Sequence, residues 1–289
     1  MKMKILVALI VIAALNGCTK KEQGNTEMAT PLVVKVGISA RDYKQVNGDN
    51  HINKQPMGVN FHKKHWSSNA RGTVLVDHGA YSLTLENVLH STGTEDTDRP
   101  NSGIYKFEIN GGLAKESTIL HDEARKRLTA LTHNLLENGW MPYIYYNDPR
   151  LSPEQGYKYY REEDDYYNIP PTYKLNLDEW MSLENMQWHF YADGVFLEIT
   201  LRRDSKRMVA DEPGAYLIAY SLYGNETHAH NQFDSDDMYN WRELWVKKIG
   251  RLKSERAKIE ASLEEKGYQI FTDYQEPVVH EADPVAAAE

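Results

Sequence analysis

The sequence predicts an α+β protein with two similar tandem domains, each a mostly antiparallel sheet covered by one long amphipathic helix. A helix–glycine–aromatic pattern occurs twice in the chain, which indicates an internal repeat. Segments of alternating apolar and polar residues precede each copy and are typical of half-buried strands. Apolar residues spaced three and four apart run up to each glycine, as they do on one face of a buried helix.

The N-terminus has the pattern of an export signal. After Lys2 and Lys4, residues 5–15 (ILVALIVIAAL) form an apolar run that suits a signal peptide and is too short for a permanent span. The LNGC that follows ends at Cys18 and resembles the lipobox of bacterial lipoproteins. The resemblance implies a signal peptide over 1–17, a diacylglycerol and palmitate anchor on Cys18, and a periplasmic location. The alternative is an ordinary secretory signal that happens to contain a cysteine.

Two further observations bear on the anchor. Thr19, rather than an aspartate, follows the cysteine, and in lipoproteins of enteric type this implies export to the outer membrane. Cys18 is the only cysteine, which fits lipidation better than disulfide chemistry. Residues 18–30 are polar and lack periodicity, so we expect a flexible tether.

The charge of the chain limits its partners. The formal net charge of −9 argues against nucleic acid and against docking on anionic lipid, so the membrane contact is expected only through the lipid on Cys18. An acidic body suits a basic protein partner, or simply solubility.

The repeat is clearest where LLENGWMPYIYYNDP (135–149) aligns without a gap over LEEKGYQIFTDYQEP (263–277). Gly139 and Gly267 fall at the position where a left-handed residue ends a helix. Residues 137–149 taken alone suit either an aromatic ligand platform or a core strand. The second copy keeps the glycine, the neighbouring aromatics and the closing acid–proline pair. The repeat therefore favours a structural role for residues 137–149 over a ligand platform.

The segments before each helix define the rest of the repeat. Residues 76–88 resemble 191–204, and 102–111 resemble 213–224, so each half reads strand–strand–helix–strand. We expect domains at 31–153 and 173–277, with a linker over 154–172 and a short, acidic, disordered tail over 278–289.

The linker has an unusual composition, in which tyrosines alternate with acidic residues. Tyrosine gives a large amphipathic contact area, and acids beside it select a basic partner. The alternative is a plain linker whose tyrosines pack over both domains. The predicted partner-binding residues are Tyr157, Tyr159, Tyr160, Glu162, Glu163, Asp164, Asp165, Tyr166 and Tyr167.

Candidate chemistry is weaker. Residues 227–237 contain His228, His230 and three aspartates, which suits a metal site, but they suit better a polar loop with Ser235 or Asp236 capping the next helix. The motifs G-x-S-x-G, S-x-x-K and H-E-x-x-H are missing from the sequence. We therefore expect no enzyme activity, no catalytic residue, no metal and no cofactor.

With its lipobox, acidic body and duplicated α+β units, the chain resembles the periplasmic immunity lipoproteins that neutralise phospholipase effectors of type VI secretion. The resemblance implies a toxin inhibitor that covers the lipase entrance, with a neighbour-encoded effector as its partner. Two alternatives stay open. One is an envelope assembly or maintenance lipoprotein that binds outer-membrane components, and the other is a metal-dependent periplasmic hydrolase centred on 227–237.

Overall fold

The computed structural model describes residues 30–49, 51–184 and 186–283. The predicted signal peptide, Cys18 and the tether up to residue 29 lie outside the described residues, as do residues 284–289 of the predicted tail.

Within these ranges the chain forms α-helices and β-strands of very different length. The helices are α1 (Ala40–Asn47), α2 (His121–Glu137), α3 (Pro153–Glu162), α4 (Leu177–Ser182), α5 (Asn225–His230) and α6 (Trp241–Glu265). The strands are β1 (Leu32–Val34), β2 (His51–Lys54), β3 (Val59–His65), β4 (Gly72–Val76), β5 (Leu83–Asp96), β6 (Ile104–Gly111), β7 (Ile119–Leu120), β8 (Met141–Pro142), β9 (Met186–Ala192), β10 (Val195–Arg203), β11 (Pro213–Gly214) and β12 (Tyr216–Gly224).

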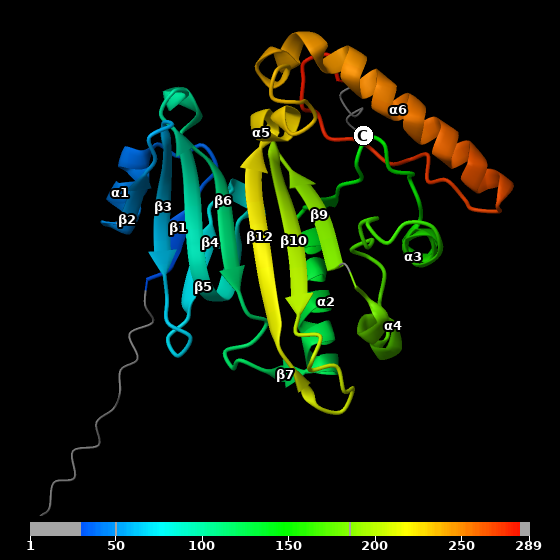
Figure 1. The fold of residues 1–289 in the computed structure, drawn as a ribbon, viewed down its shortest axis with the longest axis horizontal. Helices are drawn as coiled ribbons and strands as arrows, with labels where there is room; N and C mark the ends of the chain where they lie inside the picture. Colours follow the sequence, from blue (N-terminus) through cyan, green and yellow to red (C-terminus); the bar gives the residue numbers. More distant parts are fainter. Residues whose placement is uncertain (1–29, 50, 185, 284–289) are drawn as a thin grey trace, which may run out of the picture.

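Ten of these strands form one sheet with the order β1-β4-β5-β6-β12-β10-β9-β8, and β3 with β2 branches from β5 (Figure 1). β1 and β4 pair in parallel, and the other pairings found in the described residues are antiparallel. The prediction of a mixed α and β fold with a mainly antiparallel sheet is confirmed. Strands from both predicted domains belong to this single sheet, because β6 pairs with β12 from Lys106↔Tyr223 to Gly111↔Ile218.

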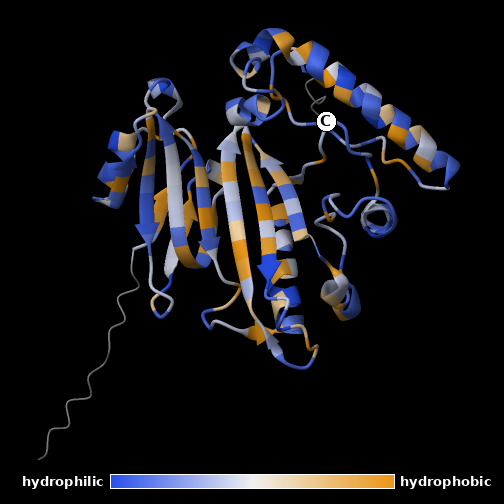
Figure 2. Cartoon of the chain, viewed as in Figure 1, coloured by the Kyte–Doolittle hydropathy of each residue, from blue (hydrophilic) through white to orange (hydrophobic). Residues whose placement is uncertain are grey.

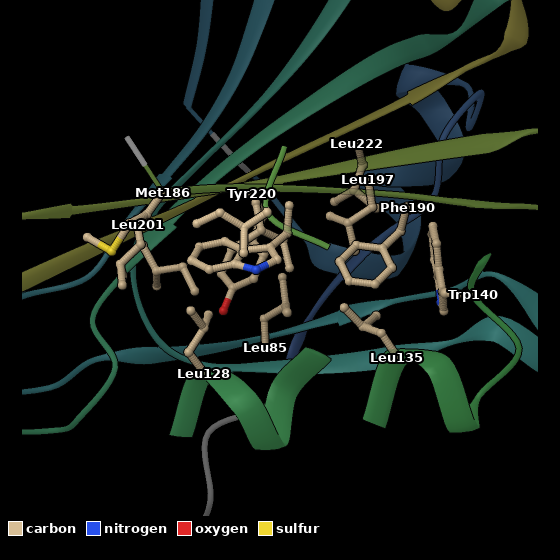
Figure 3. Packing of buried hydrophobic residues seen from close by; sticks show 14 of the residues in the cluster. Leu85, Leu128, Leu135, Trp140, Met186, Phe190, Leu197, Leu201, Tyr220 and Leu222 are labelled. Atoms are coloured by element: carbon tan, nitrogen blue, oxygen red, sulfur yellow. The ribbon is translucent and has the colours of Figure 1, made fainter. Parts of the chain in front are cut away.

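Helix α2 covers one face of the sheet. Asp122 and Glu123 in its first turn interact favourably with the helix dipole, and Gly139 with φ 86° follows its end, as the sequence predicts. Leu128 and Leu135 lie two turns apart on the face that meets the sheet. Figure 3 shows both pointing toward the strand residues of the core, which include Leu85, Met186, Phe190, Leu197, Leu201, Tyr220 and Leu222.

Helix α6 belongs to a second apolar cluster on the opposite face. Trp241, Trp245 and Ile249, four positions apart on the stripe that the sequence predicts, are buried, and Figure 2 shows apolar and polar residues alternating along the helix. Alternation along β10 separates the two clusters, since Leu197 packs with the α2 cluster and Phe196 with the α6 cluster. In Figure 1 the orange α6 lies at the upper right, while α2 lies behind β10 and β9.

Two local expectations about residues 227–237 are wrong. Neither Ser235 nor Asp236 caps the long helix, because α6 begins at Trp241 after a short 3₁₀ turn (Met238–Asn240). The predicted loop at 227–237 overlaps the end of α5, where His228 and His230 are buried.

The predicted tail is packed over residues 278–283 rather than disordered. Val279 is buried in the α6 cluster. Asp283 accepts a hydrogen bond from Trp245 Nε1 at 2.8 Å and two more from the backbone N–H groups of Val279 and His280. The aspartate therefore caps its own turn and ties this end of the chain to α6, an interaction that depends on the tertiary fold and not on the local sequence.

Candidate functional site

A pocket of about 300 Å³ lies where three distant segments meet over β9. Residues 141–151, 167–172 and 271–275 supply nearly all of its walls. The lining residues are Met141, Pro142, Tyr143, Ile144, Asp148, Leu151, Pro153, Tyr167, Asn168, Ile169, Pro170, Pro171, Thr172, His189, Phe271, Asp273, Tyr274 and Gln275.

The first wall is positioned by the end of α2. The positive φ of Gly139 reverses the chain, so that β8 pairs with β9 and the backbone N–H of Tyr143 donates to the carbonyl of His189 at 2.9 Å. The rings of Tyr143 and Tyr146 are buried beneath this segment. The scaffold prediction for 137–149 is confirmed for these aromatic side chains, but the same segment also lines the pocket.

The C-terminal segment forms the opposite wall. The Tyr274 hydroxyl accepts a hydrogen bond from the Ile144 backbone N–H at 2.9 Å, and the Phe271 N–H donates to the Arg150 carbonyl at 2.7 Å. A β-bridge joins Leu151 and Ile270. These contacts join the C-terminal segment to residues 144–151.

A partly buried ion pair ties the first wall to α6. Arg150 donates through Nε and Nη2 to the two carboxylate oxygens of Glu260 at 2.9 and 2.7 Å, and its backbone N–H donates to the same group at 2.9 Å. Although burial alone would raise it, these hydrogen bonds hold the pKa of Glu260 below its ordinary value. The pair is therefore charged and geometrically constrained on both sides.

Asp148 is a half-buried carboxyl group in the lining of the pocket. Among the residues that the structure describes, no hydrogen-bond donor or ion-pair partner reaches its carboxylate. Burial, assisted by the nearby Asp164, raises the pKa of Asp148 to about 7, against the opposing effect of Arg256. Arg256 is itself engaged, since it donates to Glu276 at 2.6 Å and to the Tyr145 carbonyl at 2.6 Å.

The floor of the pocket is polar but uncharged. Burial lowers the pKa of His189, so its imidazole is neutral at pH 7. Its Nδ1 lies 3.3 Å from the Asn168 amide nitrogen, and the ring of Tyr145 packs edge-on against it at 4.9 Å. The mouth is mixed, because Met141 and Phe271 each keep 46% of their surface exposed and the exposed Thr172, Asp273 and Gln275 also line the pocket.

The structure brings only part of the predicted partner-binding segment to this pocket. Tyr167 lines it, and Asp164 lies close enough to affect Asp148. Tyr159 and Tyr160 are buried in the core and Tyr157 stacks on Tyr173 at 4.4 Å. These three side chains contribute to packing, as the linker alternative expects.

The remaining members of that segment lie at the surface. Tyr166 is 74% exposed, and Glu162, Glu163 and Asp165 are exposed beside it. Glu163 pairs with Lys266 at 2.6 Å, which joins α3 to the end of α6. Asp164 of this turn raises the pKa of Asp148, which lines the pocket, so the acidic turn at 162–165 adjoins the pocket.

The proposed metal-binding histidines are used for packing. His228 stacks on Phe196 with ring centroids 3.8 Å apart, and its Nε2 lies 3.2 Å from the Tyr143 hydroxyl. Burial lowers the pKa of His228 to about 3. His230 Nδ1 lies 3.2 Å from Arg99 Nη1. Within the described ranges, no group of three or more potential metal ligands is gathered.

Reasoning from the sequence missed Asp148, His189, Tyr274, Met141 and Phe271 as site residues. The gapless repeat contained the signal that could have found most of them. Tyr143 aligns with Phe271 and Tyr146 with Tyr274, and the two copies of the repeated segment form opposite walls of the pocket.

In the part of the chain that the structure covers, no helix has the length and apolarity to cross a membrane. Comparison of the chain with protein-family models, with curated proteins and with solved structures finds no match.

Proposed function

We propose that this chain is a lipid-anchored periplasmic protein that binds a toxic effector, a secreted phospholipase, and neutralises it by occlusion, without chemistry of its own. The observation that carries the proposal is the pocket with Met141 and Phe271 exposed in its lining and the acidic turn at 162–165 beside it. Protein partners are commonly held by one anchor side chain in a pocket surrounded by polar residues.

The charge distribution supports a basic partner. The chain carries a formal charge of −9, and acids beside the mouth would speed encounter with a positively charged surface. Exposed Met141, Phe271 and Tyr166 would supply the apolar contact area.

We also propose that residues 31–153 and 173–277 are copies of one ancestral unit. Each copy has an antiparallel hairpin (β5 with β6, β10 with β12) and then a long helix followed by a glycine of positive φ. The two φ values, 86° at Gly139 and 85° at Gly267, are nearly the same. An anchored body with two such units would let both copies of the repeated segment contact one partner.

The test of function uses the neighbouring genes. A strain lacking this gene and the adjacent effector gene should be killed by the parent strain, and expression of the chain should restore survival. Met141→Asp combined with Phe271→Asp should abolish protection, whereas Val46→Asp, at a residue 56% exposed on α1, should leave it intact. Survival of the deletion strain without the chain, or lack of co-elution of the chain with the purified effector, would contradict the proposal.

The anchor is tested separately. Cys18→Ser should move the protein from the membrane fraction to the soluble periplasmic fraction, because it removes the thiol that carries the lipid. Continued membrane association of the variant would contradict anchoring through Cys18.

A further inference from the structure

We infer that the pocket between 141–151, 167–172 and 271–275 binds an alkyl cation, a lysine or arginine side chain of the partner, with its stem along the apolar wall and its charge on Asp148. The identity of the occupant as a protein side chain rests on the proposed function. The preference for an alkyl cation rests on the pocket alone.

The size of the pocket limits the occupant. A volume of about 300 Å³ lies at the lower end of the range for small-ligand sites. It suits one long side chain better than a lipid tail or a peptide strand. The stem of such a side chain would lie against Ile144, Leu151 and Pro170, since long cationic side chains pack their methylenes on apolar surface.

The charge of the lining selects a cation. Among the residues that the structure describes, the lining includes Asp148 and Asp273 and no lysine or arginine. His189 at the floor is neutral because of its burial, so nothing in the lining would compensate a carboxylate or a phosphate. An anionic ligand would face two acids, and a neutral ligand would leave Asp148 unpaired.

Asp148 gains most from such an occupant. Within the described residues its carboxylate has no donor, and its partial burial disfavours the charged form, as the raised pKa of Asp148 shows. Arg256, the nearby cation, is held by Glu276 and the Tyr145 carbonyl and does not supply the pairing. An ammonium or guanidinium entering past Met141 and Phe271 would supply it and would lie near the Tyr274 and Tyr167 rings.

The experiment uses hexylammonium as the probe, with hexan-1-ol and hexanoate as matched neutral and anionic controls. The soluble Cys18→Ser chain is labelled with ¹³C-methyl methionine and titrated at pH 8, with Met141 as the reporter at the mouth. Hexylammonium should shift the Met141 methyl resonance saturably and bind at least about tenfold more tightly than either control, the ratio that 1.4 kcal/mol of pairing gives. Equal binding of hexan-1-ol, or tighter binding of hexanoate, would overturn the inference.

Two variants separate the roles of the acids. Asp148→Asn should weaken hexylammonium binding to the level of hexan-1-ol, while Asp165→Asn, on the exposed turn outside the lining, should leave it unchanged. If Asp148→Asn binds hexylammonium as tightly as the wild type, the Asp148 carboxylate is not the group that pairs with the cation. The wild-type comparison among the three probes holds whether or not the variants fold.

The role of the pocket in binding the partner is measured separately, as the Kd of the complex between the chain and the effector. If the effector complex forms and Asp148→Asn leaves its Kd unchanged, the assignment of a partner side chain to the pocket fails and the proposed function survives. If hexylammonium binds and no effector complex forms, the proposed function fails and the cation site survives.

Discussion

Asp148 is a carboxyl group whose surroundings oppose its charge. Its pKa is raised from an ordinary value of 3.8 to about 7, so between these pH values the folded chain binds more protons than the unfolded chain. The free energy of unfolding therefore falls as pH rises from about 4 to 7. We expect Asp148→Asn to be more stable than the wild type by about 1–3 kcal/mol at pH 8, and by almost nothing at pH 4.

Urea unfolding of the two proteins at pH 8 and pH 4 measures this difference. Asp164→Asn is the control for a general loss of negative charge, and it should stabilise less because Asp164 acts on Asp148 only through space. If the wild type is as stable as Asp148→Asn at pH 8, then the surroundings of Asp148 do not disfavour its charged form and the prediction is wrong.

The pKa shift of His228 changes the free energy of unfolding with pH in the opposite direction. Burial lowers its pKa to about 3 from 6.5, so the unfolded chain binds more protons in this interval and stability is lost as pH falls through it. His228→Phe should keep the stacking on Phe196 and lose the hydrogen bond to Tyr143, at a cost of about 1 kcal/mol at pH 7.5. Thermal unfolding between pH 7.5 and 4.5 should show a shallower decline in Tm for the variant. An equal decline would show that other groups cause the acid sensitivity.

At the scale of the element, the two helix ends give a matched pair. Gly139 and Gly267 both have positive φ, but a Cβ on Gly139 would come within 2.9 Å of Tyr81 Cε1, while a Cβ on Gly267 would meet no atom of the described residues within 4 Å. Gly267→Ala should cost about 1 kcal/mol from backbone strain alone, and Gly139→Ala should cost more because Tyr81 must also move. Chemical denaturation of both variants gives the comparison, and equal losses would mean that the contact with Tyr81 is easily relieved.

The same helices show what the sequence could predict. The stripes on α2 and α6 and the glycines that end them depend on residues a few positions apart, and they appear where expected. The pairing of β6 with β12, the packing of Tyr159 and Tyr167, and the fold of the last residues onto Trp245 depend on contacts between distant segments. A single sequence carries no register for such contacts, so it does not predict the pocket that they create, although two of the three lining segments belong to the repeat.

At the scale of the whole molecule, the sheet couples the two halves of the chain. Leu85 of β5 and Leu222 of β12 belong to one buried cluster, and the β6–β12 pairing crosses from one predicted domain to the other. We therefore expect one cooperative unfolding unit, in which damage to the core of one half lowers the stability of both.

Phe190→Ala tests this coupling, because Phe190 of β9 is fully buried in the same cluster and its truncation should cost about 3–5 kcal/mol. Native-state hydrogen exchange should show this loss for the slowest amides of β10 and equally for those of β5 on the other side of the β6–β12 pairing. Val246→Ala, at a residue 63% exposed on α6, should change neither set. Loss of protection confined to β9, β10 and β12 would instead identify two independent domains within one continuous sheet.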